Sequence, residues 1–204
     1  MKAKPIKILF TLLAASALYC NAATENTPVA VVPTATADTI PSPAQSPRTT
    51  SLQDSIHQTF LQKAAQKNRP GTRAANFAYL NRQEKKTTLY RIKANRLLLL
   101  FYEPDCPHCI ETINTLDNHP RLRRQVREKT WTILAIYADG DRILWQREKD
   151  KLPRDWNAGF ATAEIFDREL YILPEMPTIY LLDKDKTVLL KETTPQELLK
   201  LLND

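Results

Sequence analysis

The alternation of apolar and polar positions divides the chain into segments of extended and helical type. The run from Leu97 to Tyr102 is continuously apolar, which is typical of a short strand covered on both faces, and Pro104 follows closely. Apolar residues then recur at helical spacing over residues 107–117, before another apolar strand from Trp131 to Tyr137. This alternation predicts an α/β domain whose sheet is covered by helices.

The segments before and after the apolar strand at 131–137 also have apolar residues at helical spacing. Leu122 and Val126 predict a short helix before it. Residues 141–150 predict a helix after it, with Ile143 and Leu144 buried. Residues 153–175 show no regular period, so we expect an irregular segment anchored by its aromatic and branched side chains.

The C-terminal part reads as a hairpin followed by a helix. Residues 178–182 and 187–190 are apolar, and the polar residues 183–186 between them predict the turn. Pro195 is expected to begin the last helix, because proline is tolerated in a first helical turn.

Two elements are expected before the long apolar strand. Residues 51–70 predict a packing helix capped by Ser51, and residues 71–90 predict a hairpin around a polar turn. The helix is expected to bury one apolar face, formed by Leu52, Ile56, Phe60 and Leu61.

The first fifty residues have a different character. Residues 1–22 combine a basic start with an apolar run too short to span a bilayer, which predicts a secretory signal peptide and an exported, periplasmic protein. Cys20 leaves open a lipoprotein anchor, although the bulky Tyr19 before it does not suit a lipidation site. Residues 23–50 are rich in Pro, Thr, Ala and Ser and predict a disordered linker.

The net charge of the chain says little about its binding partners. The chain has 204 residues and a net charge of +6, and three of its lysines fall within the predicted signal. This balance gives no case for nucleic acid, and the arginines at 121–127 alternate with apolar residues as on a solvated helix face.

The remaining two cysteines stand three positions apart, in the sequence Cys106-Pro107-His108-Cys109. They follow a buried strand and begin a helix, where unpaired backbone N–H groups stabilise a thiolate. Cys106 is therefore expected to be the nucleophile, and Cys109 to resolve the mixed disulfide. Pro107 suits the first turn, and a protonated His108 would favour the thiolate and tune the redox potential.

Residues 97–109, together with Met176-Pro177-Thr178 and the strand after it, resemble the thioredoxin superfamily, and residues 71–204 as a whole resemble its exported TlpA/ResA-type members. The resemblance implies a thioredoxin fold with an N-terminal hairpin and a central insertion at 141–175. It also implies thiol–disulfide oxidoreductase activity on protein substrates and a membrane electron donor or acceptor. Pro177 would have a cis peptide bond, and Met176 would present its backbone to the substrate. No dissociable cofactor is implied.

The chain departs from the family pattern at two positions. Leu100 replaces the buried acid of thioredoxin, and Thr112 stands where the reductases often have a glutamate. The Pro-His pair between the cysteines matches the oxidase DsbA, while the surrounding sequence favours a reductase. The direction of electron flow therefore stays open.

Two functions other than catalysis are compatible with the sequence. A structural zinc site needs about four ligands, and these two cysteines with one histidine are too few and too close together. Copper handling suits thiolates and imidazole, although a second ligand cluster is missing from the sequence. A non-catalytic interaction module is the other alternative.

Overall fold

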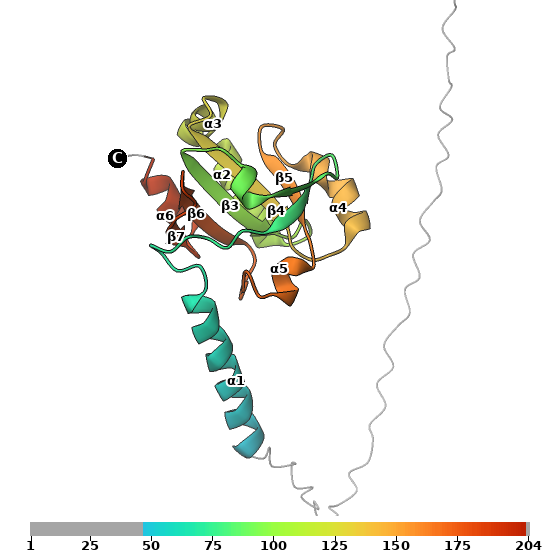
Figure 1. Ribbon diagram of the computed structural model, residues 1–204, viewed down its shortest axis with the longest axis vertical. Coiled ribbons are helices and arrows are strands. Elements are labelled where there is room, and N and C mark those ends of the chain that lie inside the picture. Colours follow the sequence, from blue (N-terminus) through green and yellow to red (C-terminus); the bar gives the residue numbers. More distant parts are fainter. Residues whose placement is uncertain (1–46, 203–204) are drawn as a thin grey trace, which may run out of the picture. The chain divides into compact units, whose positions relative to one another are not determined.

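Strand β3 lies near the middle of a seven-stranded mixed sheet with the order β2-β1-β5-β4-β3-β6-β7 (Figure 1). The computed structural model describes residues 47–202, with side chains from residue 52 onward. The strands are β1 (Ala78–Asn81), β2 (Lys86–Thr88), β3 (Arg96–Tyr102), β4 (Trp131–Tyr137), β5 (Asn157–Ala161), β6 (Thr178–Asp183) and β7 (Val188–Lys191). The α-helices are α1 (Pro47–Gln66), α2 (Pro107–Asn118), α3 (Pro120–Arg127), α4 (Arg142–Glu148), α5 (Glu164–Asp167) and α6 (Pro195–Lys200). Two 3-10 turns, η1 (Leu89–Arg91) and η2 (Lys149–Lys151), follow β2 and α4.

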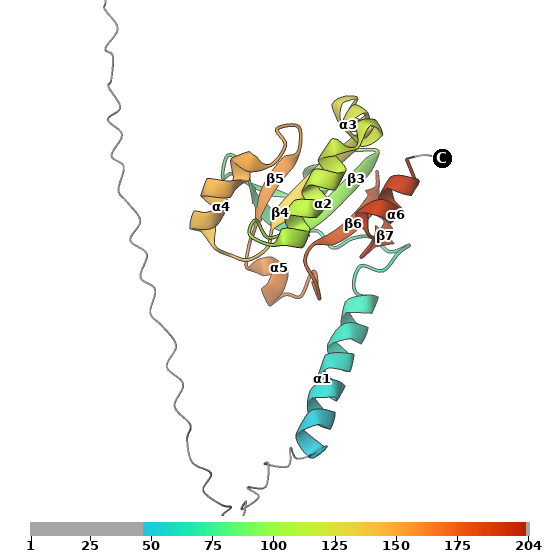
Figure 2. The ribbon, with the colours of Figure 1, turned by 180° about the vertical axis from the view of Figure 1, so that it is seen from behind.

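Successive side chains of β3 point to opposite faces of the sheet and belong to two separate core layers. Leu98, Leu100 and Tyr102 pack in the layer covered by helices α2, α3, α4 and α6 (Figure 2). Leu97, Leu99 and Phe101 pack on the other face, against aromatic residues of β1 and β6, the segment before β1 and the α5–β6 loop. The continuous apolar run at 97–102 therefore has the two-sided burial that the sequence predicted.

The two neighbours of β3 run in opposite directions. β4 pairs with it in parallel, with Tyr102 beside Tyr137, and β6 pairs antiparallel, with Phe101 beside Thr178. The end of β3, the end of β4 and the beginning of β6 therefore meet at one edge of the sheet. Helix α2 also begins at this edge (Figure 2).

The expectation of an irregular segment at 153–175 is wrong, because residues 157–161 form β5 and residues 164–167 form α5. β5 pairs parallel with β4 and antiparallel with β1. A β-carbon on Gly159 would lie 2.6 Å from Ile136 Cδ1 and 2.6 Å from Tyr79 Cδ2, so only glycine fits there. Glycine has low strand propensity, and this weakened the sequence signal.

The burial predicted for the helix after β4 is also partly wrong. Ile143 is 73% exposed, whereas Trp145 is fully buried and packs against Phe160 at a ring separation of 5.5 Å. α4 is seven residues long and begins one residue after its cap Asp141, whose Oδ1 accepts from the amides of Ile143 and Leu144. This start directs the indole, and not Ile143, toward the sheet.

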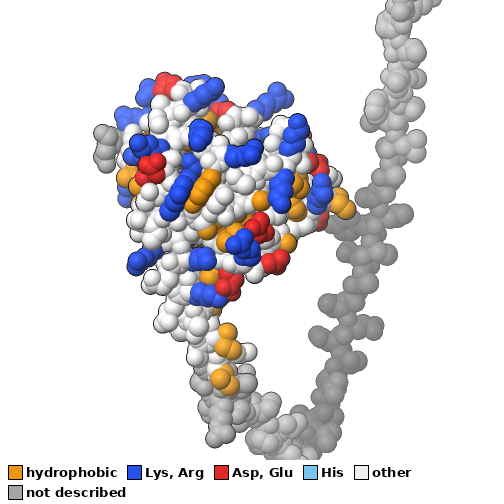
Figure 3. Space-filling model, in the orientation of Figure 1, with side chains coloured by type: hydrophobic (Ala, Val, Ile, Leu, Met, Phe, Trp, Pro, Cys, Tyr) orange, Lys and Arg blue, Asp and Glu red, His pale blue; other side chains and the backbone are white. Residues whose placement is uncertain are grey.

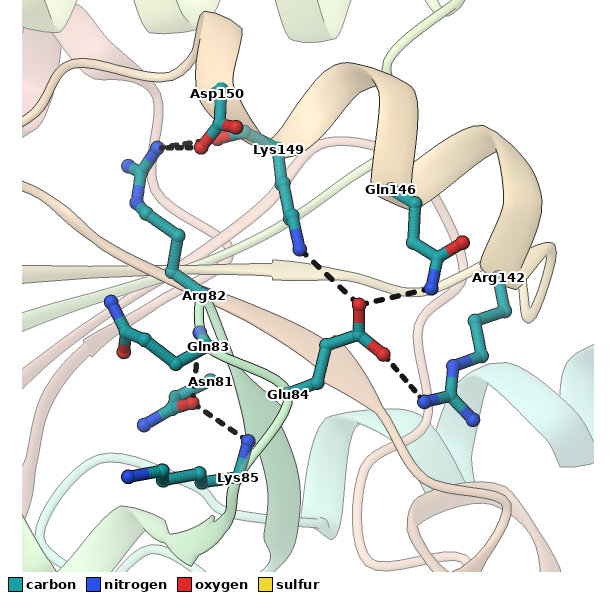
Figure 4. Close-up of polar contacts among 9 residues, drawn as sticks. All are labelled: Asn81, Arg82, Gln83, Glu84, Lys85, Arg142, Gln146, Lys149 and Asp150. Carbon is teal, nitrogen blue, oxygen red and sulfur yellow. Dashed lines mark hydrogen bonds and ion pairs between the residues drawn. The ribbon is translucent and has the colours of Figure 1, made fainter.

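The β1–β2 hairpin is present as predicted, and its turn is fastened to the insertion that carries α4 and η2 (Figure 4). Arg82 donates to the Lys149 carbonyl at 2.7 Å and to Asp150 Oδ1 at 3.2 Å. Glu84 accepts from Arg142 at 2.6 Å, and this contact is the main cause that lowers the pKa of Glu84. Polar contacts thus fix the insertion against the hairpin.

Helix α1 differs from the packing helix expected at 51–70. It begins at Pro47, inside the predicted linker, since proline is compatible with a first turn, and it ends at Gln66. Of its expected buried face, Leu52 is 64%, Ile56 69% and Phe60 43% exposed. Only the end of the helix is anchored: Ala64 is buried, and Lys63 Nζ donates to Glu169 Oε1 at 2.7 Å.

The predicted signal at 1–22, with Cys20, and the linker up to residue 46 lie outside the described residues. Within residues 47–202, no helix combines the length and the apolar character that crossing a bilayer requires.

The close contacts of Gly159 generate a first prediction. Gly159→Val should lower the free energy of unfolding by about 1–3 kcal/mol, because the added carbons overlap Ile136 and Tyr79. Gly140→Asn is the matched control: no heavy atom lies within 4 Å of a β-carbon there, and asparagine tolerates left-handed backbone. Urea denaturation of both variants measures the difference. Equal stability of the two would show that β5 does not pack as described.

Candidate active site

Cys106 is the N-cap residue of α2, four positions after the end of β3. Its Sγ accepts a hydrogen bond from the Cys109 amide at 3.4 Å, and the side chain is half-buried. The sulfur thus receives one of the helix's unpaired N–H groups and faces the positive end of the helix dipole. Both features stabilise a thiolate at a position that a partner can reach.

Cys109 is fully buried, one turn further into α2. The pKa of its thiol is raised to about 12, chiefly by burial, and the neighbouring Cys106 sulfur and the charge of Glu103 act in the same direction. The Glu103 amide donates to Cys109 Sγ at 3.4 Å and opposes this shift. Near neutral pH Cys109 is therefore a protonated thiol, buried beneath the more accessible Cys106 sulfur.

The Met176–Pro177 peptide bond is cis, as the family resemblance implied. The Met176 carbonyl lies 3.9 Å from Cys106 Sγ, within reach of its thiol proton. β6 begins immediately afterwards at Thr178. Residues separated by 70 positions in the sequence are thus brought side by side.

The two residues between the cysteines face solvent. Pro107 occupies the first position of α2, where its missing N–H removes no helical hydrogen bond. His108 is exposed, so any charge it carries acts on the sulfur through solvent. The first-turn position of Pro107 agrees with the sequence prediction, and the tuning role of His108 stays a prediction.

The position of the acid that thioredoxin uses is apolar here. Leu100 is fully buried in the core, and Thr112, at the alternative position, is also buried. Glu103 is the acid whose backbone contacts Cys109, and burial raises the pKa of its carboxyl, helped by the charges of Asp139 and Asp105.

Asp139 was not singled out from the sequence. It follows β4, and its Oδ2 accepts from the Tyr137 hydroxyl at 3.0 Å. A signal was available, because parallel strands end at the same edge of a sheet, so the residues after β3 and after β4 lie close together. In residues 47–202, no group of three or more His, Cys, Asp or Glu side chains is arranged to hold a metal ion.

Comparison with known structures gives the class to which this geometry belongs. A thioredoxin-like protein from Bacteroides caccae is 34% identical with a TM-score of 0.69, over 79% of this chain and 57% of that protein. The C-terminal domain of an uncharacterized protein from Bacteroides fragilis is 36% identical with a TM-score of 0.65, over 67% of this chain and 99% of that one. At 19% identity and a TM-score of 0.54, the thioredoxin domain of a thiol–disulfide oxidoreductase from Bacteroides vulgatus shares the fold.

These matches, with the paired cysteines and the cis-proline, define a thioredoxin-like protein. The chain belongs to the thioredoxin-like superfamily. It spans 57% of the length of the Bacteroides caccae protein. No known family profile matches the sequence, and no curated protein does.

The unequal burial of the two sulfurs generates a second prediction. In a Cys106→Ser variant, the rate of Cys109 alkylation by iodoacetamide should still rise with pH above pH 9. Burial, the largest cause that raises the pKa of this thiol, is kept in the variant. The complementary Cys109→Ser variant reports Cys106 alone and should react much faster at pH 7. Mass spectrometry of the alkylated protein across a pH series measures both rates. A rate for Cys109 that levels off below pH 9 would contradict its burial.

Proposed function

We propose that this protein is an exported thiol–disulfide oxidoreductase that reduces disulfides of client proteins. One observation carries the proposal: Cys106 caps α2 at the surface, above a buried second thiol and beside the Met176 carbonyl. A site built only for packing would not leave one sulfur reachable and hold the other protonated beneath it. The superfamily and the named activities of structural neighbours support the same class of reaction.

In the first step the Cys106 thiolate attacks one sulfur of the client disulfide. A mixed disulfide forms, the client S–S bond breaks, and the second client sulfur leaves as a thiolate that takes up a proton. The Cys109 amide, which donates a hydrogen bond to Cys106 Sγ before the reaction, lies in the first turn of α2, next to the sulfur that forms the new bond. The carbonyl of Met176 is positioned to accept a hydrogen bond from the backbone of the bound client.

In the second step Cys109 loses its proton and attacks Cys106 Sγ. The mixed disulfide breaks, the Cys106–Cys109 disulfide forms, and the client leaves as a dithiol that has gained two electrons. The barrier to this step includes the deprotonation of a buried thiol with a pKa of about 12. Formation of the mixed disulfide removes the Cys106 thiolate, one of the charges that raises that pKa.

Each cycle leaves the pair oxidised, so a dithiol donor has to reset it. We propose that this donor is a membrane protein on the exported side, and that the clients are proteins with exposed disulfides. The proposal of export is supported by the sequence pattern at residues 1–22, and a lipid anchor at Cys20 is the alternative attachment.

Single-cysteine variants test the reaction. Cys106→Ser should lose reduction of a peptide disulfide to the uncatalysed rate, because the attacking sulfur is gone. Cys109→Ser should still attack, and it should accumulate a mixed disulfide that a gel shift or mass spectrometry detects. Thr112→Ser, which keeps a buried hydroxyl beside the site, is a control expected to retain the full rate. Full activity in Cys106→Ser would exclude the proposal.

The reduction potential tests the direction of electron flow and the role of His108. A reductase should lie near thioredoxin at about −270 mV, and an oxidase near about −120 mV. His108→Ala should make the potential more negative by at most about 30 mV, because the side chain is exposed and any charge on it acts on the thiolate through solvent. His57→Ala, an exposed histidine on α1, is the matched control and should change nothing. A positive shift in His108→Ala would contradict the tuning role.

A further inference from the structure

A groove of about 600 Å³ lies between α1 and the segment that leads from α5 into β6. One wall is formed by Ile56, Phe60 and neighbouring residues of α1. The other wall runs from Phe166 through Ile172 to Met176. Both walls are predominantly apolar, and the Lys63–Glu169 ion pair closes the groove at the anchored end of the helix.

The apolar face of α1 is exposed without a partner in the part of the chain that the structure describes. Leu52, Ile56 and Phe60 recur every four residues, so they share one side of the helix. Their exposed fractions are 64%, 69% and 43%, and Phe166 across the groove is 41% exposed. Figure 3 shows hydrophobic side chains open to solvent along α1. An occupant that covered these side chains would gain the free energy of removing them from water.

The groove shares one residue with the redox centre. Met176 lines the groove, and the carbonyl of the same residue is 3.9 Å from Cys106 Sγ. One residue of extended chain spans about 3.3 Å. A polypeptide joined to Cys106 and lying along the Met176 backbone therefore reaches the groove within a few residues of its own cysteine.

We propose that this α1 groove binds the client polypeptide and selects clients with apolar side chains next to the reactive cysteine. The proposal rests on the proposed function, and it names the class of substrate. The groove favours leucine-like or phenylalanine-like side chains because its lining is mainly apolar. Its two charged lining residues, Lys63 and Glu169, are paired with each other. The shared Met176 favours a client over a second copy of this chain, because a client joined to Cys106 already lies beside a residue that lines the groove.

The consequence is selectivity among disulfides. Small disulfides such as oxidised glutathione reach Cys106 without occupying the groove. A peptide with apolar neighbours gains additional contacts as it approaches the sulfur. The apolar peptide should therefore react faster, and its advantage should depend on α1.

The test compares three disulfides with the reduced full-length chain by stopped-flow kinetics. They are a peptide disulfide with Leu and Phe beside its cysteines, the same peptide with Ser at those positions, and oxidised glutathione. The variant is Ile56→Ser/Phe60→Ser, which changes only exposed positions of α1. Ile143→Ser, at an equally exposed isoleucine on α4 outside the groove, is the matched control. Circular dichroism checks that α1 remains folded in each variant.

We expect the double variant to lower the rate with the apolar peptide about tenfold, which corresponds to about 1.4 kcal/mol. The rates with the serine peptide and glutathione should stay unchanged, and Ile143→Ser should behave as wild type. No loss in the double variant, or an equal loss with all three disulfides, would overturn the groove as a client site. So would sedimentation showing a wild-type dimer that the double variant dissociates.

The two proposals fail in different ways. A wild-type protein that exchanges with all three disulfides at matched rates refutes the groove alone and leaves the oxidoreductase in place. A wild-type protein that exchanges with none of them overturns the proposed function and the groove together.

Discussion

The antiparallel register between β3 and β6 is the constraint on which the site depends. Phe101 pairs with Thr178, so the residues just after β3 face those just before β6 across one sheet edge. Cys106 follows the first strand and Met176 precedes the second, and their separation is 3.9 Å between sulfur and carbonyl oxygen. A slip of one residue would move every side chain of β3 to the opposite core layer.

The same edge places two cysteine side chains in different environments. Cys106 is half-buried at the helix N-cap, where dipoles and an N–H favour its anion. Cys109 lies only one turn inward, yet it is fully buried, and the absence of water raises its pKa to about 12. Both residues are cysteines, so their positions along the first turn of α2 alone make one sulfur half-buried and the other fully buried.

Elements added around this centre stabilise it and extend its surface. The β1–β2 hairpin and the insertion with β5 widen the sheet, and Arg82 and Glu84 join them through hydrogen bonds and ion pairs (Figure 4). α1 is fastened only by its last turns, which leaves its apolar stripe open next to Met176. Glu103, whose amide contacts Cys109 Sγ, lies within electrostatic range of Asp105 and Asp139.

The sequence by itself determined the parts whose signal is local. The apolar run at 97–102, the Cys-x-x-Cys at a strand-to-helix junction and the final helix at Pro195 each follow from neighbouring residues. Only the tertiary structure decided what depends on distant partners. β5 exists because Gly159 fits between Ile136 and Tyr79, although its own residues have weak strand propensity. The apolar face of α1 is exposed because periodicity shows that a helix has such a face but not whether another element covers it.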